Sequence, residues 1–171
     1  ERLARSLGDP RQQSEVALRQ AACAEATSDY SGAIATARRS VRLARTAQDP
    51  AGEVAGLLRW GVALWRLGNF AGAGAKVRRA MRLAQLGDLL PLVAESARVL
   101  GVIALDQGDL DRAESLLEQN LQACRQAGNR LAEGRTLSNL GIVFGRRGDA
   151  ARAREHYERA LRISQEVGDR R

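Results

Sequence analysis

Residues 137–161 read LSNLGIVFGRRGDAARAREHYERAL, and this stretch decides the fold. Apolar side chains recur at helical spacing as far as Phe144, and a second helical stripe starts at Ala153. Between them, Gly148 suits a left-handed helix stop, and Asp149 suits the N-cap of a following helix. The stretch therefore predicts two helices joined by a tight turn.

The same pattern returns at a step of 40 residues along the chain. One column of small residues contains Ala21, Gly61, Gly101 and Gly141, and another is always alanine, at positions 33, 73, 113 and 153. Small side chains at both positions let two helices approach closely, and the shared register indicates four copies of one supersecondary unit. We predict an all-α chain with eight helices, at about residues 11–27, 30–47, 51–67, 70–86, 90–107, 110–127, 130–147 and 150–167.

Each copy is expected to close at a second polar connection. These connections are Gln48-Asp49, Gly87-Asp88, Gly128-Asn129 and Gly168-Asp169. They place the repeats at about 11–49, 51–88, 90–129 and 130–169, in a single array over residues 1–171. Because the chain begins at Glu1 and reaches its last residues where another repeat would start, we expect a piece of a longer protein. An array without end caps also makes end-to-end self-assembly an alternative function.

The composition, with 44% apolar and 27% charged residues, is that of an ordinary globular domain. No stretch approaches the roughly 20 apolar residues of a membrane span, and no targeting signal opens the chain, so we expect a cytoplasmic protein. Cys23 and Cys124 lie far apart, and His156 is the single histidine. We therefore expect both cysteines to be core residues and expect no metal, cofactor or catalytic constellation.

These columns resemble the tetratricopeptide repeat family, whose pattern runs large residue, Leu-Gly, aromatic, then Ala and aromatic. The last copy carries it as Leu137, Leu140-Gly141, Phe144, Ala153 and Tyr157. The resemblance implies a right-handed superhelix of α–α pairs that acts as a non-enzymatic scaffold for protein–protein interaction. The period of 40 exceeds the family's usual value of about 34, and such long repeats resemble those of kinesin light chains and maltose-activator-like bacterial regulators. A sensor or docking segment of a bacterial signal-transduction or transcription regulator is thus implied.

The resemblance also implies where a ligand binds, because the first helices of the family's repeats line a concave, peptide-holding face. Asn139, in Ser138-Asn139-Leu140-Gly141, resembles the family's peptide-gripping asparagine. Arginines nearby offer forked donors to carboxylates, so an acidic peptide or protein segment is the expected partner. A merely solvated face is the alternative reading of each arginine. The expected groove residues are Arg19, Arg59, Val62, Trp65, Arg66, Arg98, Arg135, Asn139 and Arg146.

The net charge of +7 is concentrated in residues 1–90, which carry 14 basic and 8 acidic side chains. Two predicted second helices, 30–47 and 70–86, contain basic residues and no acidic one. The expected convex basic stripe consists of Arg38, Arg42, Arg45, Arg78, Arg82 and Arg162. Three interpretations of this stripe remain open: it is simply solvated, it docks an acidic protein domain, or it binds nucleic-acid phosphates. We find no aromatic residue interleaved with these arginines, which counts against stacking of single-stranded bases. Trp60, beside Gly61, is expected in the core.

Overall fold

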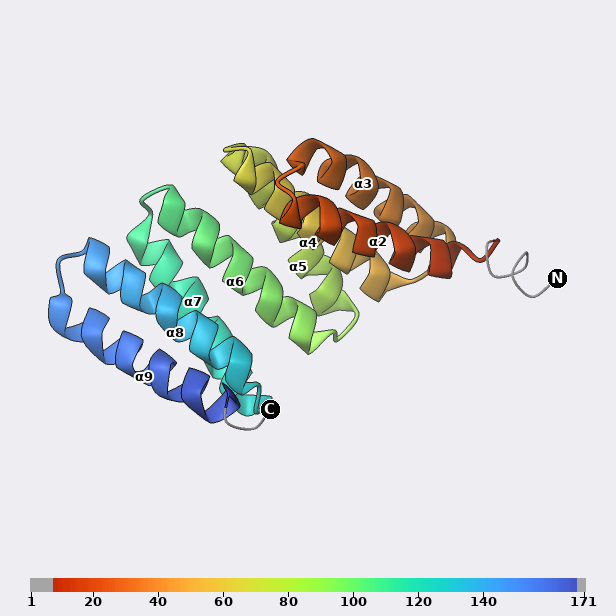
Figure 1. Cartoon of the computed structure of the whole chain (residues 1–171). Coiled ribbons are helices and arrows are strands. Elements are labelled where there is room, and N and C mark those ends of the chain that lie inside the picture. The colour runs from red at the N-terminus through yellow and green to blue at the C-terminus, as the bar shows by residue number, and fades with distance from the viewer. Residues whose placement is uncertain (1–7, 169–171) are drawn as a thin grey trace. The chain divides into compact units, whose positions relative to one another are not determined.

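The computed structural model describes residues 8–168, which form eight α-helices and no β-strand (Figure 1). The helices are α2 (Pro10–Ala26), α3 (Tyr30–Thr46), α4 (Pro50–Arg66), α5 (Phe70–Leu86), α6 (Leu90–Asp106), α7 (Leu110–Gln126), α8 (Arg130–Arg146) and α9 (Ala150–Gly168). The all-α prediction is confirmed, and every predicted helix end lies within one residue of the observed end. No helix in the described part of the chain is long and apolar enough to cross a membrane.

The helices fall into two compact units, and the division between Ser96 and Ala97 lies inside α6. In the first unit, α2 packs against α3, α3 against α4, and α4 against α5. In the second unit, α7 packs against α8, and α8 against α9. Consecutive helices run antiparallel within each unit (Figure 1). Each unit therefore contains helix pairs of the predicted kind.

The turns between helices have a repeated cap geometry. Asp29, Asp49, Asn69, Asp109 and Asn129 each accept a hydrogen bond at the helix N-terminus from the backbone N–H three residues ahead. These bonds satisfy one of the donors that a helix start leaves free. The same geometry holds at Asp149, whose side chain accepts from the N–H of Arg152.

A left-handed residue precedes each of these caps, as predicted for Gly148, whose φ is 80°. The prediction was wrong at Gly87-Asp88. Gly87 has φ of −98°, and it is Asp88 that takes the left-handed conformation, at 51°. The register of 40 places Asp88 in the column of Gln48, so the connection lies one residue later than the sequence pattern suggested. The predicted Gly168-Asp169 connection extends beyond the described residues.

The small-residue columns lie where helices touch. Ala33, Ala73 and Ala113 are fully buried. A Cβ atom added to Gly61 would lie 2.5 Å from Cγ2 of Val77, so α4 approaches α5 too closely for any side chain there. In the second unit, a core cluster that includes Leu117 and Phe144 fills the space between the helices; the full set is Ala104, Leu105, Ala113, Leu117, Leu121, Leu137, Leu140, Val143, Phe144, Ala153, Ala160 and Ile163.

Cysteine placement departs from expectation at one position. Cys124 is buried, as predicted, but Cys23 on α2 is exposed. Alanine neighbours on α2, Ala17 and Ala21, supply the buried face of that helix instead. No group of His, Cys, Asp or Glu side chains in residues 8–168 is arranged to hold a metal ion.

Candidate functional site

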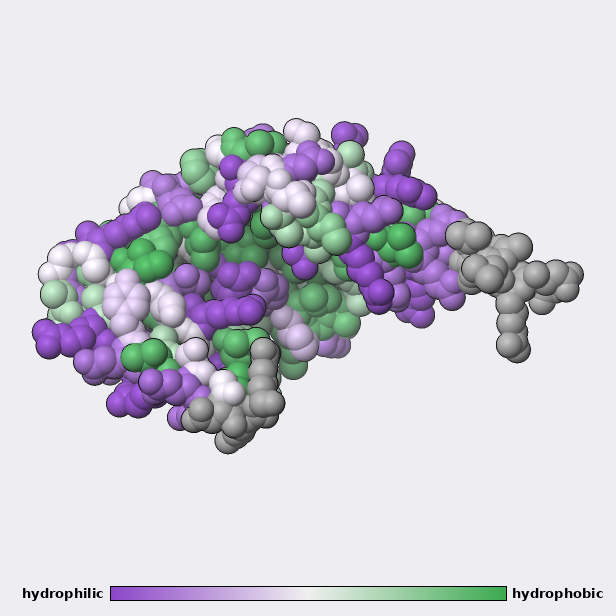
Figure 2. All heavy atoms as spheres, in the orientation of Figure 1, coloured by the Kyte–Doolittle hydropathy of each residue, from purple (hydrophilic) through white to green (hydrophobic). Residues whose placement is uncertain are grey.

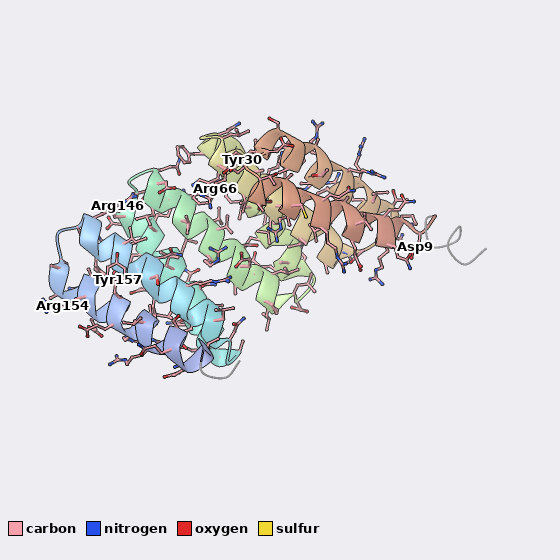
Figure 3. The ribbon with its side chains drawn as sticks, in the orientation of Figure 1. Asp9, Tyr30, Arg66, Arg146, Arg154 and Tyr157 are labelled. Atoms are coloured by element: carbon pink, nitrogen blue, oxygen red, sulfur yellow. The ribbon has the colours of Figure 1, made fainter. Side chains whose placement is uncertain are left out.

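A cluster of charged and aromatic residues on α2 and α4 brings together four side chains, three of them predicted groove residues. Arg59 donates a hydrogen bond to Glu25, with 3.1 Å between the guanidinium nitrogen and the carboxylate oxygen. The guanidinium of Arg66, near the C-terminal end of α4 (Figure 3), lies 4.4 Å from the centroid of the Trp65 ring. We call Glu25, Arg59, Trp65 and Arg66 the first-helix cluster, because both helices are the first of their pairs.

Glu25 was not among the predicted groove residues. Burial raises the pKa of its carboxyl group, and the charges of Arg59 and Arg66 offset only part of that effect. Its Oε1 atom is buried and accepts no hydrogen bond within the described chain. Of the other two predicted groove residues of this unit, Arg19 is exposed and Val62 is half-buried.

The predicted groove residues of the second unit lie on α6 and α8. Arg146 of α8 donates a hydrogen bond to the backbone carbonyl oxygen of Leu105 and pairs with Asp106 at 3.5 Å. Arg135 lines a small pocket between α8 and α9, of about 150 Å³. Arg98 and Asn139 are both half-buried. The structure thus assigns Arg146 a contact between α6 and α8, which sequence reasoning did not anticipate.

The basic side chains of the second helices meet at a cavity in the first unit. This α3–α5 cavity has a volume of about 540 Å³. Its wall carries two side chains from α5, Lys76 and Arg79, and its floor includes Leu57 and Trp60 of α4. Three predicted stripe residues from α3 also line it, namely Arg38, Arg42 and Arg45.

Trp60 contradicts two sequence-based expectations. It is half-buried rather than a core residue, and it lies among the basic side chains that we had described as free of aromatics. The ammonium of Lys76 lies 4.0 Å from the ring centroid, and the guanidinium carbon of Arg38 lies 5.4 Å from it. One feature of the sequence could have indicated this contact. Trp60 lies between two predicted helices, 30–47 and 70–86, that contain basic residues and no acidic one.

Not all of the predicted stripe residues line the cavity. Arg78 and Arg82 are exposed on α5 and do not line the cavity, and Arg162 lies on α9 in the second unit. One acidic residue serves the cavity, because Glu53 pairs with Arg45 at 2.8 Å and with Arg79 at 3.4 Å.

An apolar pocket of about 460 Å³ lies between α8 and α9. Tyr157 and Leu161 line it and are 44% and 59% exposed, although Leu117, one repeat before Tyr157, is fully buried. Tyr157 and Arg154 both project from α9 (Figure 3). On the face in Figure 2, the hydrophobic patches over α8 and α9 are small and separated by hydrophilic residues.

Comparison with solved structures finds the same helical architecture in several proteins. BtubC from P. vanneervenii is 20% identical, with a TM-score of 0.79 over 94% of this chain and 66% of BtubC. The apo form of RapI is 13% identical, with a TM-score of 0.82 over 93% of this chain and 58% of RapI. MamA is 17% identical, with a TM-score of 0.66 over 96% of this chain and 85% of MamA. This chain thus spans just under two thirds of the length of BtubC, and at these identities the likeness establishes the fold.

No curated protein matches the sequence significantly. The model of one sequence family does match, over residues 53–119 and again over 92–166. These two overlapping segments cover more than half of the chain and follow the helix pairs seen in the structure. The chain belongs to the tetratricopeptide repeat family.

Proposed function

We propose that this chain is a non-enzymatic protein-interaction scaffold, and that it serves as a sensor or docking segment of a bacterial signal-transduction or transcription regulator. Membership of the tetratricopeptide repeat family supports protein–protein interaction in general. In this proposal the four repeats act as a single array, and an acidic peptide or protein segment binds along the first helices. No metal or cofactor takes part.

The observation that carries the proposal is the first-helix cluster. Glu25 holds Arg59 in place through one nitrogen, while the Arg59 side chain stays 44% exposed and keeps its other N–H donors. Arg66 is likewise oriented by the Trp65 ring. Arginines that are already oriented lose less conformational entropy when they bind a carboxylate, so the cluster favours an acidic ligand.

Glu25 adds a feature that suits a peptide. Its buried Oε1 accepts no hydrogen bond from the described residues, and an unsatisfied buried acceptor is costly. If the Glu25 carboxylate rotates toward the surface on binding, a backbone N–H of a bound peptide would satisfy this atom while Arg59 binds an acidic side chain. The cluster therefore offers both an acceptor and a donor to an extended chain.

Selection from a displayed peptide library tests this function. We expect enrichment of acidic peptides, with at least about tenfold weaker binding of the enriched peptides to Arg59→Gln and to Asn139→Ala. Arg82→Gln is the matched control, since it removes an exposed charge away from the cluster and should bind as the unaltered chain does. Enriched peptides that bind all four proteins equally would contradict the assignment.

Self-assembly is a second candidate because of the exposed apolar pocket on α8 and α9. A second copy could cover Tyr157 and Leu161, whose counterparts in earlier repeats are more buried. Light scattering over a range of concentrations tests this. An average mass that rises with concentration, and that Leu161→Glu returns to the monomer value, supports assembly, whereas a constant monomer mass rejects it.

A further inference from the structure

The α3–α5 cavity is a formed pocket within one compact unit. Its floor is fixed by Val41 and Leu57, which are almost completely buried where α3 and α4 pack. A volume of about 540 Å³ falls in the range typical of ligand sites. The space is therefore large enough for a few side chains of a partner.

The charges that surround this cavity are not balanced. Five basic side chains line it, and within residues 8–168 Glu53 is the single carboxylate paired with any of them. Glu53 engages Arg45 and Arg79. None of the described carboxylates forms an ion pair with the remaining three, Arg38, Arg42 and Lys76. The cavity consequently concentrates positive potential in a partly enclosed space, where it is less screened by solvent.

Trp60 brings two of these cations together. Lys76 and Arg38 come from different helices, and each lies against the same indole ring. The ring attracts both cations, but the two like charges repel each other across it. An anion that contacts both cations would remove this repulsion. We therefore expect an anionic ligand to bind more tightly here than at an isolated surface arginine.

The repeat architecture does not require this arrangement. In the next two repeats, the position of Trp60 is occupied by Leu100 and Leu140. The position of Lys76 is occupied by Leu116 and His156. In the α8–α9 pair, Arg152 lies over the ring of Phe144, but each of the two pockets described there is lined by a single basic residue. The combination of Trp60 with five basic residues is thus particular to this cavity.

We propose that the α3–α5 cavity binds an acidic segment of a partner protein, with clustered carboxylate or phosphoryl oxygens placed against Arg38, Arg42 and Lys76. Forked guanidinium donors suit both kinds of oxygen. A nucleic acid fits less well, because Trp60 already carries cations on its ring and the exposed Arg78 and Arg82 do not extend the cavity into a track. This site is independent of the first-helix cluster and of its proposed ligand.

Fluorescence of Trp60 provides a direct test. In a Trp65→Phe background, Trp60 is the single tryptophan of the chain. The probes are octaglutamate, a phosphoserine-containing version of the same peptide, sodium pyrophosphate and oligothymidylate. We expect saturable changes of Trp60 emission with one or both peptides, and comparison of the two shows whether carboxylate or phosphoryl oxygens bind more tightly.

Matched arginine variants separate this site from general charge attraction. Arg42 and Arg82 occupy the same repeat position, but only Arg42 lines the cavity. We expect Arg42→Gln, and the double variant Arg38→Gln/Lys76→Gln, to weaken peptide binding about tenfold or more. Arg82→Gln should bind as the parent does, and unchanged helical circular dichroism establishes that each variant is folded.

Several outcomes would overturn the proposal. These are no emission change with either peptide at low salt, equal weakening by Arg42→Gln and Arg82→Gln, and tighter binding of oligothymidylate or pyrophosphate than of both peptides. The third result would identify a nucleic-acid or free-phosphate site instead. Because the readout is the emission of Trp60, which lines this cavity, failure of this site is distinguishable from failure of the first-helix cluster to bind its ligand.

Discussion

Arg59 on α4 and Glu25 on α2 form an ion pair, 3.1 Å apart, between the first helices of two successive repeats. The pair links two positions 34 residues apart in the sequence. Its acidic member is the more buried, with a side chain 14% exposed, while that of Arg59 is 44% exposed. The pair therefore affects both stability and the charge that the first-helix cluster presents to a ligand.

Arg59→Gln should destabilise the chain more at neutral pH than at acid pH. Burial raises the pKa of Glu25, so the stability linked to this group is complete when it is protonated and is lost as the pH rises through its folded pKa. Arg59 opposes that loss only while Glu25 is ionised. At neutral pH we expect the free energy of unfolding of Arg59→Gln to be lower than that of the parent by less than about 1 kcal/mol, because Arg59 is exposed. In acid we expect almost no difference. Urea unfolding of both proteins measures it, with Arg19→Gln as a control whose effect does not vary with pH.

Glu133→Gln should cost about 2 kcal/mol of stability at neutral pH. Burial raises the pKa of Glu133, but hydrogen bonds from Arg125 and Arg130 outweigh burial and lower it overall. The stabilisation is therefore present above the ordinary pKa of a glutamate and is lost as the pH falls through the lowered value. Urea unfolding at neutral and acid pH checks the difference. Glu166→Gln, which also removes a partner of Arg130 but at an exposed position, should cost less than about 0.5 kcal/mol.

Gly61→Ala should lower stability by about 1 to 3 kcal/mol. Its new Cβ would lie 2.5 Å from Cγ2 of Val77 and 3.3 Å from the backbone oxygen of Ala73. Val77 is β-branched and fully buried, so it cannot move aside. Gly145→Ala is the control, because the nearest atom would be 4.0 Å away and alanine favours the helix by about 0.5 to 1 kcal/mol. Thermal unfolding midpoints that shift in the same direction for both variants would contradict the packing argument.

Gln48→Gly should stabilise the chain by about 0.5 to 1 kcal/mol. Gln48 has φ of 50°, a left-handed conformation that disfavours any residue with a Cβ. Asp88→Gly, at φ of 51°, should raise stability by less than Gln48→Gly does, because aspartate tolerates the left-handed conformation better than glutamine. The reverse change, Gly148→Ala at φ of 80°, should lower the unfolding midpoint. A lower midpoint for Gln48→Gly would show that its side chain makes a stabilising contact that outweighs the backbone strain.

Local features of the fold were predictable because short-range interactions determine them. The Asp and Asn caps, the left-handed Gly148 and the helical apolar stripes each depend on residues within one or two turns. The one error in the turns, at Gly87-Asp88, came from matching a residue pair instead of the 40-residue register. Asp88 lies in the column of Gln48, and that register decided which residue turned left-handed.

The candidate surfaces were only partly predictable, because they depend on residues brought together from different helices. Arg59 was predicted as a groove residue, but its ion pair with Glu25 was not anticipated. Arg146 was also predicted as a groove residue, and its hydrogen bond to the backbone of Leu105 was likewise not anticipated. Neither partner is recognisable from spacing along one helix.

The sequence by itself determined the repeat, its period of 40 and the helix bounds, since these follow from backbone propensity, capping and the placement of small and apolar side chains. Tertiary structure alone decided that Trp60 leaves the core and lies with Arg38 and Lys76 in the lining of a cavity. The physical reason is that an aromatic ring beside a small-residue column can pack inward or toward the next helix pair. Only the packing of α3 and α5 on either side of α4 chooses between the two.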